Sequence, residues 1–207
     1  MGRPRIRDYD ELRRHLLDAA GHLLAEEGPQ ALSTRRVAQE VGVSTTAVYN
    51  LFGDKAGLLQ AMFLEGFARL AEAFAGVPSD GDPEAGLMAL GYAYRAAAKA
   101  NPHLYELMFS RPVADFRPDE AALARIQGTF ETLTRAVARC MEAGRFVPAD
   151  PYDIAVQLNA LVHGLASLEL RGALGTAPQA DHHWRIALEN NLRGCRQPPT
   201  TDGPRRP

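Results

Sequence analysis

The chain has 207 residues, of which 46% are hydrophobic and 23% charged, and its formal net charge is −2 at pH 7. This composition is ordinary for a soluble globular protein, and the net charge gives no global sign of nucleic-acid binding, although a local basic surface remains open. The longest uncharged run, 154–168, is too short to cross a bilayer. No signal peptide opens the chain, and Cys140 and Cys195 lack metal or redox spacing, so we expect a cytoplasmic protein without metal or cofactor.

Apolar residues recur at intervals of three and four along most of the chain, and strand patterns are almost absent. This periodicity predicts an all-α fold of about nine helices. The first helix ends at Gly28 and Pro29, which stop a helix. Two short helices follow, and after "GDK" a long fourth helix carries the boundary between two domains. Further helices are predicted at about 84–100, 102–109, 119–143, 151–173 and 181–195, and glycine, proline and aspartate cluster at their junctions.

The second and third helices form a helix-turn-helix pattern. Ser33 or Thr34 can cap the second helix, Gly42 ends it, and Ser44 can cap the third. The segment "EVGVS" between them supplies the glycine that a tight turn needs. Proteins with this arrangement place the outward-facing helix in the major groove of DNA.

The third helix separates apolar from polar side chains. Val48 and Phe52 face inward and leave one polar face outside. This polar face of the third helix contains Thr45, Thr46, Tyr49 and Asn50. Hydroxyl and amide groups bind phosphates or base edges, and a threonine methyl packs on a thymine methyl. The pattern therefore predicts a DNA-contacting surface, with Lys55 and Arg35 or Arg36 beside it as phosphate partners.

An ordinary solvated helix face is the alternative interpretation of this stretch taken alone. Residues 1–55 carry eight basic and eight acidic side chains, so net charge does not decide between the two interpretations. The position of the charges around the third helix favours DNA.

The stretch "LLDAAGHLLAEEGPQALSTRRVAQEVGVSTTAVYNLFGDKAGLL" contains the patterns A–x–x–L–x–x–x–x–G, T–x–x–x–V–A–x–x–V–G–V–S and Y–x–x–F–x–x–K–x–x–L. With these patterns, residues from about 10 to 60 resemble the DNA-binding domain of the TetR family of bacterial transcriptional regulators. The resemblance implies that the polar face of the third helix reads DNA and that Tyr49 and Lys55 touch phosphates. The expected DNA-binding residues are Ser33, Thr34, Arg35, Arg36, Ser44, Thr45, Thr46, Tyr49, Asn50 and Lys55. Leu51 stands where family members often carry histidine, which removes one polar DNA contact.

The expected organisation has four parts. Residues 1–8 form a flexible basic arm, whose "GRPRIR" either enters a minor groove or stays solvated. Residues 9–56 form the helix-turn-helix domain, and residues 57–196 form a helical ligand-binding and dimerisation domain. Residues 197–207 form a disordered tail, because they have no apolar anchor and four prolines.

In TetR regulators the second domain dimerises and binds a small-molecule effector. "NPHLYELMF" (101–109) and "LNALVHGLASLEL" (158–170) resemble the WHG-type C-terminal domain of one TetR subgroup, although the usual tryptophan before His163 and Gly164 is absent. Bulky apolar residues with a few polar tips suit such a pocket, and an ordinary core is the alternative for each of them. The expected ligand pocket contains Tyr92, Tyr105, Met108, Phe109, Phe130, Asn159 and His163.

The last two helices predict a dimer interface. Asn159, His163 and Ser167 form one polar stripe, and Ala160 and Gly164 form a strip of small residues that permits close helix approach. Two such helices from each subunit would form a four-helix interface. The expected dimer interface contains Ala160, Gly164, Ser167, Trp184, Leu188 and Leu192.

The sequence thus predicts a homodimeric repressor that binds an imperfectly palindromic operator in double-stranded DNA and is released by a small, largely apolar effector. No membrane contact and no catalytic residue are expected, since H–E–x–x–H, G–x–S–x–G, P-loop and G–x–G–x–x–G motifs are absent. Two alternatives remain open. One is a dimeric DNA-binding regulator without an effector, and the other, far less favoured, is an all-helical enzyme that uses some of the six histidines.

Overall fold

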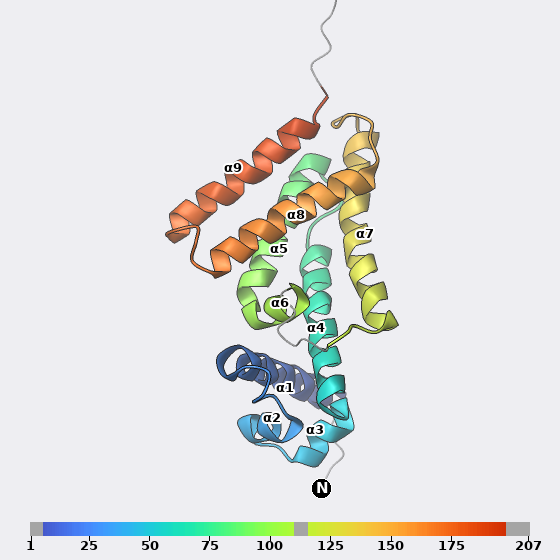
Figure 1. Ribbon diagram of the computed structural model, residues 1–207. Coiled ribbons are helices and arrows are strands. Elements are labelled where there is room, and N and C mark those ends of the chain that lie inside the picture. The colour runs from blue at the N-terminus through green and yellow to red at the C-terminus, as the bar shows by residue number, and fades with distance from the viewer. Residues whose placement is uncertain (1–5, 110–115, 198–207) are drawn as a thin grey trace, which may run out of the picture. The chain divides into compact units, whose positions relative to one another are not determined.

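The computed structural model of the chain describes residues 6–109 and 116–197, with side chains from residue 9 onward. In these residues the chain forms nine α-helices and no strand, which confirms the all-α prediction (Figure 1). The helices are α1 Ile6–Glu27, α2 Thr34–Val41, α3 Thr45–Phe52, α4 Lys55–Ala75, α5 Pro83–Ala100, α6 Pro102–Phe109, α7 Glu120–Glu142, α8 Pro151–Leu170 and α9 Ala177–Cys195.

Packing divides the chain into two compact units. The first unit contains the described residues up to Glu72 together with Ala100–Thr129. The second unit contains Ala73–Lys99 together with the described residues from Phe130 onward. The division therefore falls inside α4 and again inside α7. It lies later in α4 than the expected boundary at 56/57, because most apolar side chains of α4 belong to the same core as those of α1 to α3.

The first unit is held together by the apolar sides of its short helices. Leu16 of α1, Val37 of α2, Val48 of α3 and Leu58 of α4 are all fully buried in one core. Figure 1 shows α2 and α3 lying together beside α1, and these pairs make close contacts. Helices of eight residues are marginal alone in water, so packing against α1 and α4 stabilises α2 and α3 and fixes their direction.

Capping residues set the ends of α2 and α3 as predicted. Ser33 and Ser44 each accept a hydrogen bond from the backbone N–H three residues later, at 3.2 and 3.1 Å. Thr34, the other candidate cap, is the first residue of α2. Gly42 ends α2 with a φ of 74°, a left-handed conformation that glycine adopts without a steric cost.

The second unit has a core of its own. Trp184 of α9 and Phe146, which lies between α7 and α8, are fully buried. Figure 1 shows α8 and α9 side by side, and the two helices make close contacts. Helix α5 approaches α9 at Gly91, where an added Cβ would lie 2.9 Å from the side chain of Leu188. A larger residue at position 91 would therefore force the side chain of Leu188 to move.

Helix α8 ends earlier than expected and α9 begins earlier than expected. Helix α8 ends at Leu170 rather than at 173, and α9 begins at Ala177 rather than at 181. Gly172 adopts a φ of 73°, which stops α8 in the way that a left-handed residue stops many helices. The first turn of α9 was missed because it begins with alanine and proline and carries no apolar stripe.

Candidate nucleic-acid interface

The polar face of α3, formed by Thr45, Thr46, Tyr49 and Asn50, is exposed along its whole length. Tyr49 alone exposes 62% of its surface, which is unusual for a large aromatic side chain. Val48 and Phe52, on the opposite side of the helix, are buried in the core of the first unit, as predicted. The helix therefore presents two hydroxyls, a phenol and an amide to solvent from a fixed support.

The junction of α3 and α4 leaves no room for a side chain at Gly57. Gly53 follows α3 with a φ of 71°, and its N–H donates to the carbonyl of Tyr49 at 2.7 Å. A Cβ added to Gly57 would lie 2.0 Å from the backbone oxygen of Phe52. Backbone contacts thus hold the end of α3 against the start of α4.

The two arginines of α2 differ in their surroundings. The guanidinium of Arg36 lies 3.0 Å from Glu27 and 3.1 Å from Glu40, so nearby carboxylates neutralise its charge. Arg35 is exposed and forms no ion pair within the described part of the chain. The sequence left Arg35 and Arg36 open as phosphate partners, and of these two only Arg35 has a charge that carboxylates of the described residues do not neutralise. Thr34, at the start of the same helix, is half-buried.

Lys55 lies half-buried at the start of α4. Its ammonium group donates a hydrogen bond to the backbone carbonyl of Pro29. Asp54 precedes it and accepts a hydrogen bond from the N–H of Gly57 at 3.0 Å, which caps α4. Leu51 is half-buried and packs against the core of the first unit. The ammonium group of Lys55, beside the polar face of α3, therefore already has a hydrogen-bond partner within the chain.

The two expected flexible segments lie largely outside the described residues. Helix α1 begins at Ile6, so residues 6–8 of the expected basic arm are helical, and residues 1–5 are not described. Of the expected tail, only Gln197 is described, and its side-chain amide donates to the carbonyl of Phe146 at 3.3 Å.

The expected ligand pocket is divided between the two units. Tyr105, Met108 and Phe109 lie on α6 in the first unit, where the rings of Tyr105 and Phe109 are 4.9 Å apart. The ring of Phe109 also lies 5.9 Å from that of Phe67. Met108 packs over Gly66, whose added Cβ would lie 2.4 Å from its sulfur. In this unit the expected pocket residues pack as parts of a dense core.

The other expected pocket residues belong to the second unit. Nδ1 of His163 lies 3.4 Å from the hydroxyl of the buried Tyr94, and burial lowers the pKa of His163. The ring of Phe130 meets that of Tyr152 edge-on at 5.2 Å. Tyr92 is exposed and Asn159 is half-buried. Tyr94 is the partner that the sequence pattern did not reveal.

Three residues of the expected dimer interface are instead interior residues. Trp184, Leu188 and Leu192 are buried inside the second unit of a single chain, so they have no surface for a partner. The prediction for these three was wrong because an apolar helix stripe does not reveal whether it meets its own chain or another. Ala160 is exposed, and Gly164 and Ser167 are half-buried.

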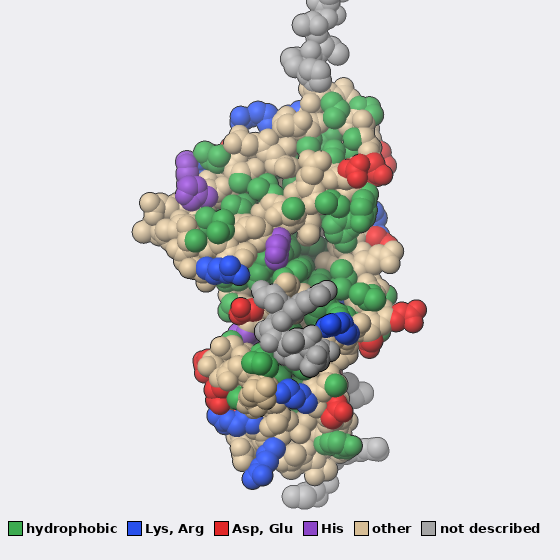
Figure 2. Space-filling view, viewed as in Figure 1, with side chains coloured by type: hydrophobic (Ala, Val, Ile, Leu, Met, Phe, Trp, Pro, Cys, Tyr) green, Lys and Arg blue, Asp and Glu red, His purple; other side chains and the backbone are tan. Residues whose placement is uncertain are grey.

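Other apolar residues on α8 and α9 are exposed. On the face that Figure 2 shows, hydrophobic side chains interrupt the polar surface over these helices. We define the apolar face of α8 and α9 by its residues, Tyr152, Val156, Ala160, Leu168 and Ile186. Tyr152 and Leu168 expose 56% and 47% of their surfaces. Exposed apolar side chains of this size often mark a contact site when they gather on one surface.

Glu169 is the centre of a polar cluster that the sequence analysis missed. Arg95 donates to both of its carboxylate oxygens at 2.7 Å, and the indole N–H of Trp184 donates at 2.7 Å. Lys99 lies 2.8 Å away, and Arg95 also pairs with Asp181 at 2.6 Å. The hydrogen bonds from Arg95 lead in lowering the pKa of Glu169 to about 2. The cluster joins α5, α8 and α9, and no local motif reveals it because its members are far apart in sequence.

A second polar cluster joins α1, α4 and the residue before α6. Glu65 is buried and accepts hydrogen bonds from Arg13 at 2.9 Å and from Arg69 at 3.0 Å. Arg69 also pairs with Asp18 at 2.8 Å and donates to the side chain of Asn101. Burial raises the pKa of Glu65, but the hydrogen bonds from Arg69 and Arg13 outweigh it and leave the pKa below its usual value.

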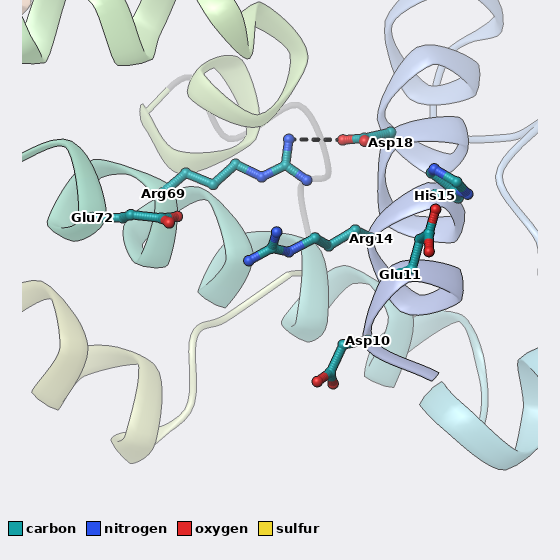
Figure 3. A pocket seen from close by; sticks show the side chains of 7 residues that line it. All are labelled: Asp10, Glu11, Arg14, His15, Asp18, Arg69 and Glu72. Atoms are coloured by element: carbon teal, nitrogen blue, oxygen red, sulfur yellow. Dashed lines mark ion pairs between the residues drawn. The ribbon is translucent and has the colours of Figure 1, made fainter. Parts of the chain in front are cut away.

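A charged cleft of about 690 Å³ opens between α1 and α4 (Figure 3). Its lining residues are Asp10, Glu11, Arg14, His15, Asp18, Arg69 and Glu72. Figure 3 shows Arg69 reaching across to Asp18. The lining lacks an apolar wall, so the cleft does not suit an apolar effector. The described residues hold no group of histidine, cysteine or carboxylate side chains placed to bind a metal, and none of their helices combines the length and apolarity needed to cross a membrane.

Two family descriptions match the chain. Residues 16–62 match "Bacterial regulatory proteins, tetR family". Residues 87–190, which are half of the chain, match "Tetracyclin repressor-like, C-terminal domain". The first match contains the polar face of α3 and the second contains α8.

Solved structures and one curated relative are also similar. A Rhodococcus sp. RHA1 protein of unknown function is 32% identical, with a TM-score of 0.77 over 90% of this chain and 96% of that chain. PfmR, a TetR family transcriptional regulator from Thermus thermophilus, is 22% identical, with a TM-score of 0.71 over 90% and 98%, which shows a shared fold. The HTH-type transcriptional repressor AcnR of Corynebacterium glutamicum is 37% identical over 60 residues, 29% of this chain. This match spans about a third of the length of AcnR (32%).

Proposed function

Because the chain belongs to the TetR family of bacterial regulatory proteins, which are DNA-binding transcriptional regulators, we propose that it is a repressor released from its operator by a small molecule. The observation that carries the proposal is the polar face of α3, exposed on a helix whose other side is buried. Operator DNA is its partner, and the cytoplasm is therefore its compartment.

The side chains around α3 divide into two classes of DNA contact. Thr46 and Asn50 read base edges, because hydroxyl and amide groups distinguish bases in the major groove. Tyr49, Lys55 and Arg35 bind phosphates, which fixes the register of the helix on the duplex. The first turns of α2 and α3 add backbone N–H groups that favour phosphate.

The repressor acts as a homodimer on an imperfect palindrome. TetR family regulators bind operator DNA as dimers. The apolar face of α8 and α9 is the contact surface in our proposal, because it exposes large apolar side chains on two neighbouring helices. Two recognition helices would then meet successive major-groove faces about 34 Å apart. A footprint of one asymmetric half-site bound by a monomer would end this proposal.

A variant pair tests the contact surface. Val156 exposes 43% of its surface on α8, whereas Leu123 exposes 56% on α7, outside the proposed interface. We expect Val156→Asp to shift the protein towards monomer in sedimentation equilibrium, because a charge would be buried against the partner. Leu123→Asp is the matched control and should leave the dimer intact. Equal effects of both changes would exclude the apolar face of α8 and α9 as the dimer interface.

The effector is a small, largely apolar molecule. Its proposed binding residues are those of the expected ligand pocket that belong to the second unit, Tyr92, Phe130, Asn159 and His163, with His163 and Tyr94 as the polar pair. Helices α4 and α7 contribute residues to both units, so a ligand that displaces either helix changes the support of α3. A coupling of about 1–3 kcal/mol is typical of such linkage and would weaken DNA binding roughly 5–150-fold.

Reciprocal linkage supplies the experiment. A thermal-stabilisation screen first identifies a binder, and its affinity is then titrated with and without operator DNA. Because linkage is reciprocal, operator must weaken ligand binding by the factor by which ligand weakens operator binding. Equal ligand affinities in both titrations would show that the ligand does not control operator binding and would overturn the effector proposal.

The second candidate is a dimeric repressor without an effector. It is favoured by the dense packing of Tyr105, Phe109 and Met108 with Phe67 and Gly66, which leaves these expected pocket residues as core. For this candidate the screen finds no ligand that changes operator affinity.

A further inference from the structure

A separate groove lies in the second unit, between the end of α4, the loop that follows it, α5 and α7. Its volume is about 370 Å³, near the lower end of the range of small-molecule sites. Phe74, Val77, Pro78 and Leu90 supply an apolar lining. No residue of the expected ligand pocket lines it, so this groove is distinct from the effector site proposed above.

Two arginines of α7 line the same groove. Arg135 and Arg139 are one helical turn apart, a spacing at which like charges repel. No carboxylate lines the groove, and neither arginine forms an ion pair within the described residues. Arg135 donates to the hydroxyl of Thr132 at 3.3 Å. Arg139 lies in the last turn of α7, where the helix dipole favours a cation, but Arg135 lies a turn earlier and gains little from it.

We propose that this groove binds a small amphiphilic anion, a carboxylate that carries an apolar chain. Arginine forks bind carboxylates through paired hydrogen bonds, so the head group lies between Arg135 and Arg139 and relieves their repulsion. The chain lies over Phe74 and Leu90, where burial of apolar surface stabilises it. The proposal goes beyond the repressor function, because it assigns a ligand class to a site outside the expected pocket.

The test uses decanoate as the probe and the full-length protein in isothermal titration calorimetry, without DNA. Decanol is the uncharged matched ligand. In the Arg135→Gln, Arg139→Gln double variant, decanoate should bind at least tenfold more weakly, whereas the Arg135→Lys, Arg139→Lys variant retains the charges and most of the affinity. Decanol affinity should be the same in both variants.

A second pair of variants tests the groove itself. Gly86 lines it, and an added Cβ would meet no atom within 4 Å, so position 86 has space for a side chain and Gly86→Leu should obstruct the groove. Gly194 on α9 is equally open but lies outside the groove. We expect Gly86→Leu to weaken decanoate binding at least tenfold and Gly194→Leu to leave it unchanged.

Two results would overturn the proposal. One is equal decanoate affinity in the glutamine and lysine double variants, which would show that the arginine charges do not bind the head group. The other is unchanged affinity in Gly86→Leu, which would place the probe elsewhere on the surface. Because no DNA is present, neither result depends on whether the protein has an effector.

Discussion

Lys55 donates a hydrogen bond from its ammonium group to the backbone carbonyl of Pro29, which joins the first turn of α4 to the loop between α1 and α2. Both ends of this contact lie in the first unit, beside the exposed polar face of α3. The bond is formed without DNA, so Lys55 has a structural role in addition to any contact with phosphate.

Lys55→Ala should therefore have two separable effects. Loss of the bond lowers the free energy of unfolding by about 1–3 kcal/mol. DNA affinity falls about equally for all sequences, and the salt slope falls by about one per lost phosphate contact in each subunit. Urea unfolding and DNA titrations at several salt concentrations measure the two effects, with Lys55→Arg as the control that keeps the charge. An unchanged salt slope would show that Lys55 stabilises the fold but does not contact phosphate.

The arginines of α2 provide a matched pair. Arg35→Gln should reduce DNA affinity and the salt slope, because its charge is exposed and unpaired within the described residues. Arg36→Gln should leave the slope nearly unchanged, because Glu27 and Glu40 already neutralise Arg36. The same salt titrations compare them. If the salt slope changed more in Arg36→Gln than in Arg35→Gln, Arg36 rather than Arg35 would be the phosphate partner.

Asn50→Ala and Thr46→Ala should change which bases are preferred more than they change average affinity. A good base contact contributes about 1–3 kcal/mol of discrimination, which its removal abolishes at that position. Selection of bound sequences from a randomised DNA library measures the preference, and Tyr49→Phe, at a proposed phosphate contact, is the control. An identical preferred sequence in all three variants would mean that α3 does not read bases.

Gly57→Ala should destabilise the first unit even though alanine is the better helix former. Its Cβ would lie 2.0 Å from the backbone oxygen of Phe52, so α3 and α4 must separate. Strain of this kind costs about 1–3 kcal/mol. Gly128→Ala, which meets no atom within 4 Å, is the control and should be neutral or stabilising. Equal thermal midpoints for the two variants would show that the turn yields without strain.

The Glu169 cluster predicts a specific pH dependence of stability. Its hydrogen bonds lower the pKa of Glu169 from the ordinary 4.5 to about 2, so the carboxylate stabilises the folded state above pH 4.5. This contribution, on the order of 3 kcal/mol, is lost as the pH falls from about 4.5 towards 2, because the unfolded chain is then protonated at this carboxyl and folding must release the proton. The difference in unfolding free energy between the wild type and Glu169→Gln should therefore shrink over this range. A difference independent of pH would show that charge is not its source.

The first unit was more predictable from sequence than the second. Ser33, Gly42 and Ser44 are local signals, since a cap acts within one turn of its own helix, and the structure confirms all three. Trp184 and Glu169 meet only through the fold, from α9 and α8, so neither periodicity nor a motif could pair them. The tryptophan was therefore assigned to an interface, although it is an interior residue that donates to the half-buried carboxylate of Glu169.

The same limit applies to charge. Arg35 and Arg36 are neighbours in sequence and equivalent by composition, and only the positions of Glu27 and Glu40 distinguish them. Glu40 lies within a turn of Arg36 and could have been counted, whereas Glu27 belongs to α1 and becomes a neighbour only when α1 and α2 pack.

Arg69 contacts Asp18, Glu65 and Asn101 through one guanidinium group. Substitutions at these four positions should therefore not be independent, because loss of the arginine leaves two carboxylates without their shared partner. A change at Asp18 that is tolerated with arginine at 69 can be harmful without it. Related chains that have lost this arginine should then carry neutral residues at both carboxylate positions, so that α1, α4 and the start of α6 diverge together along an evolutionary lineage.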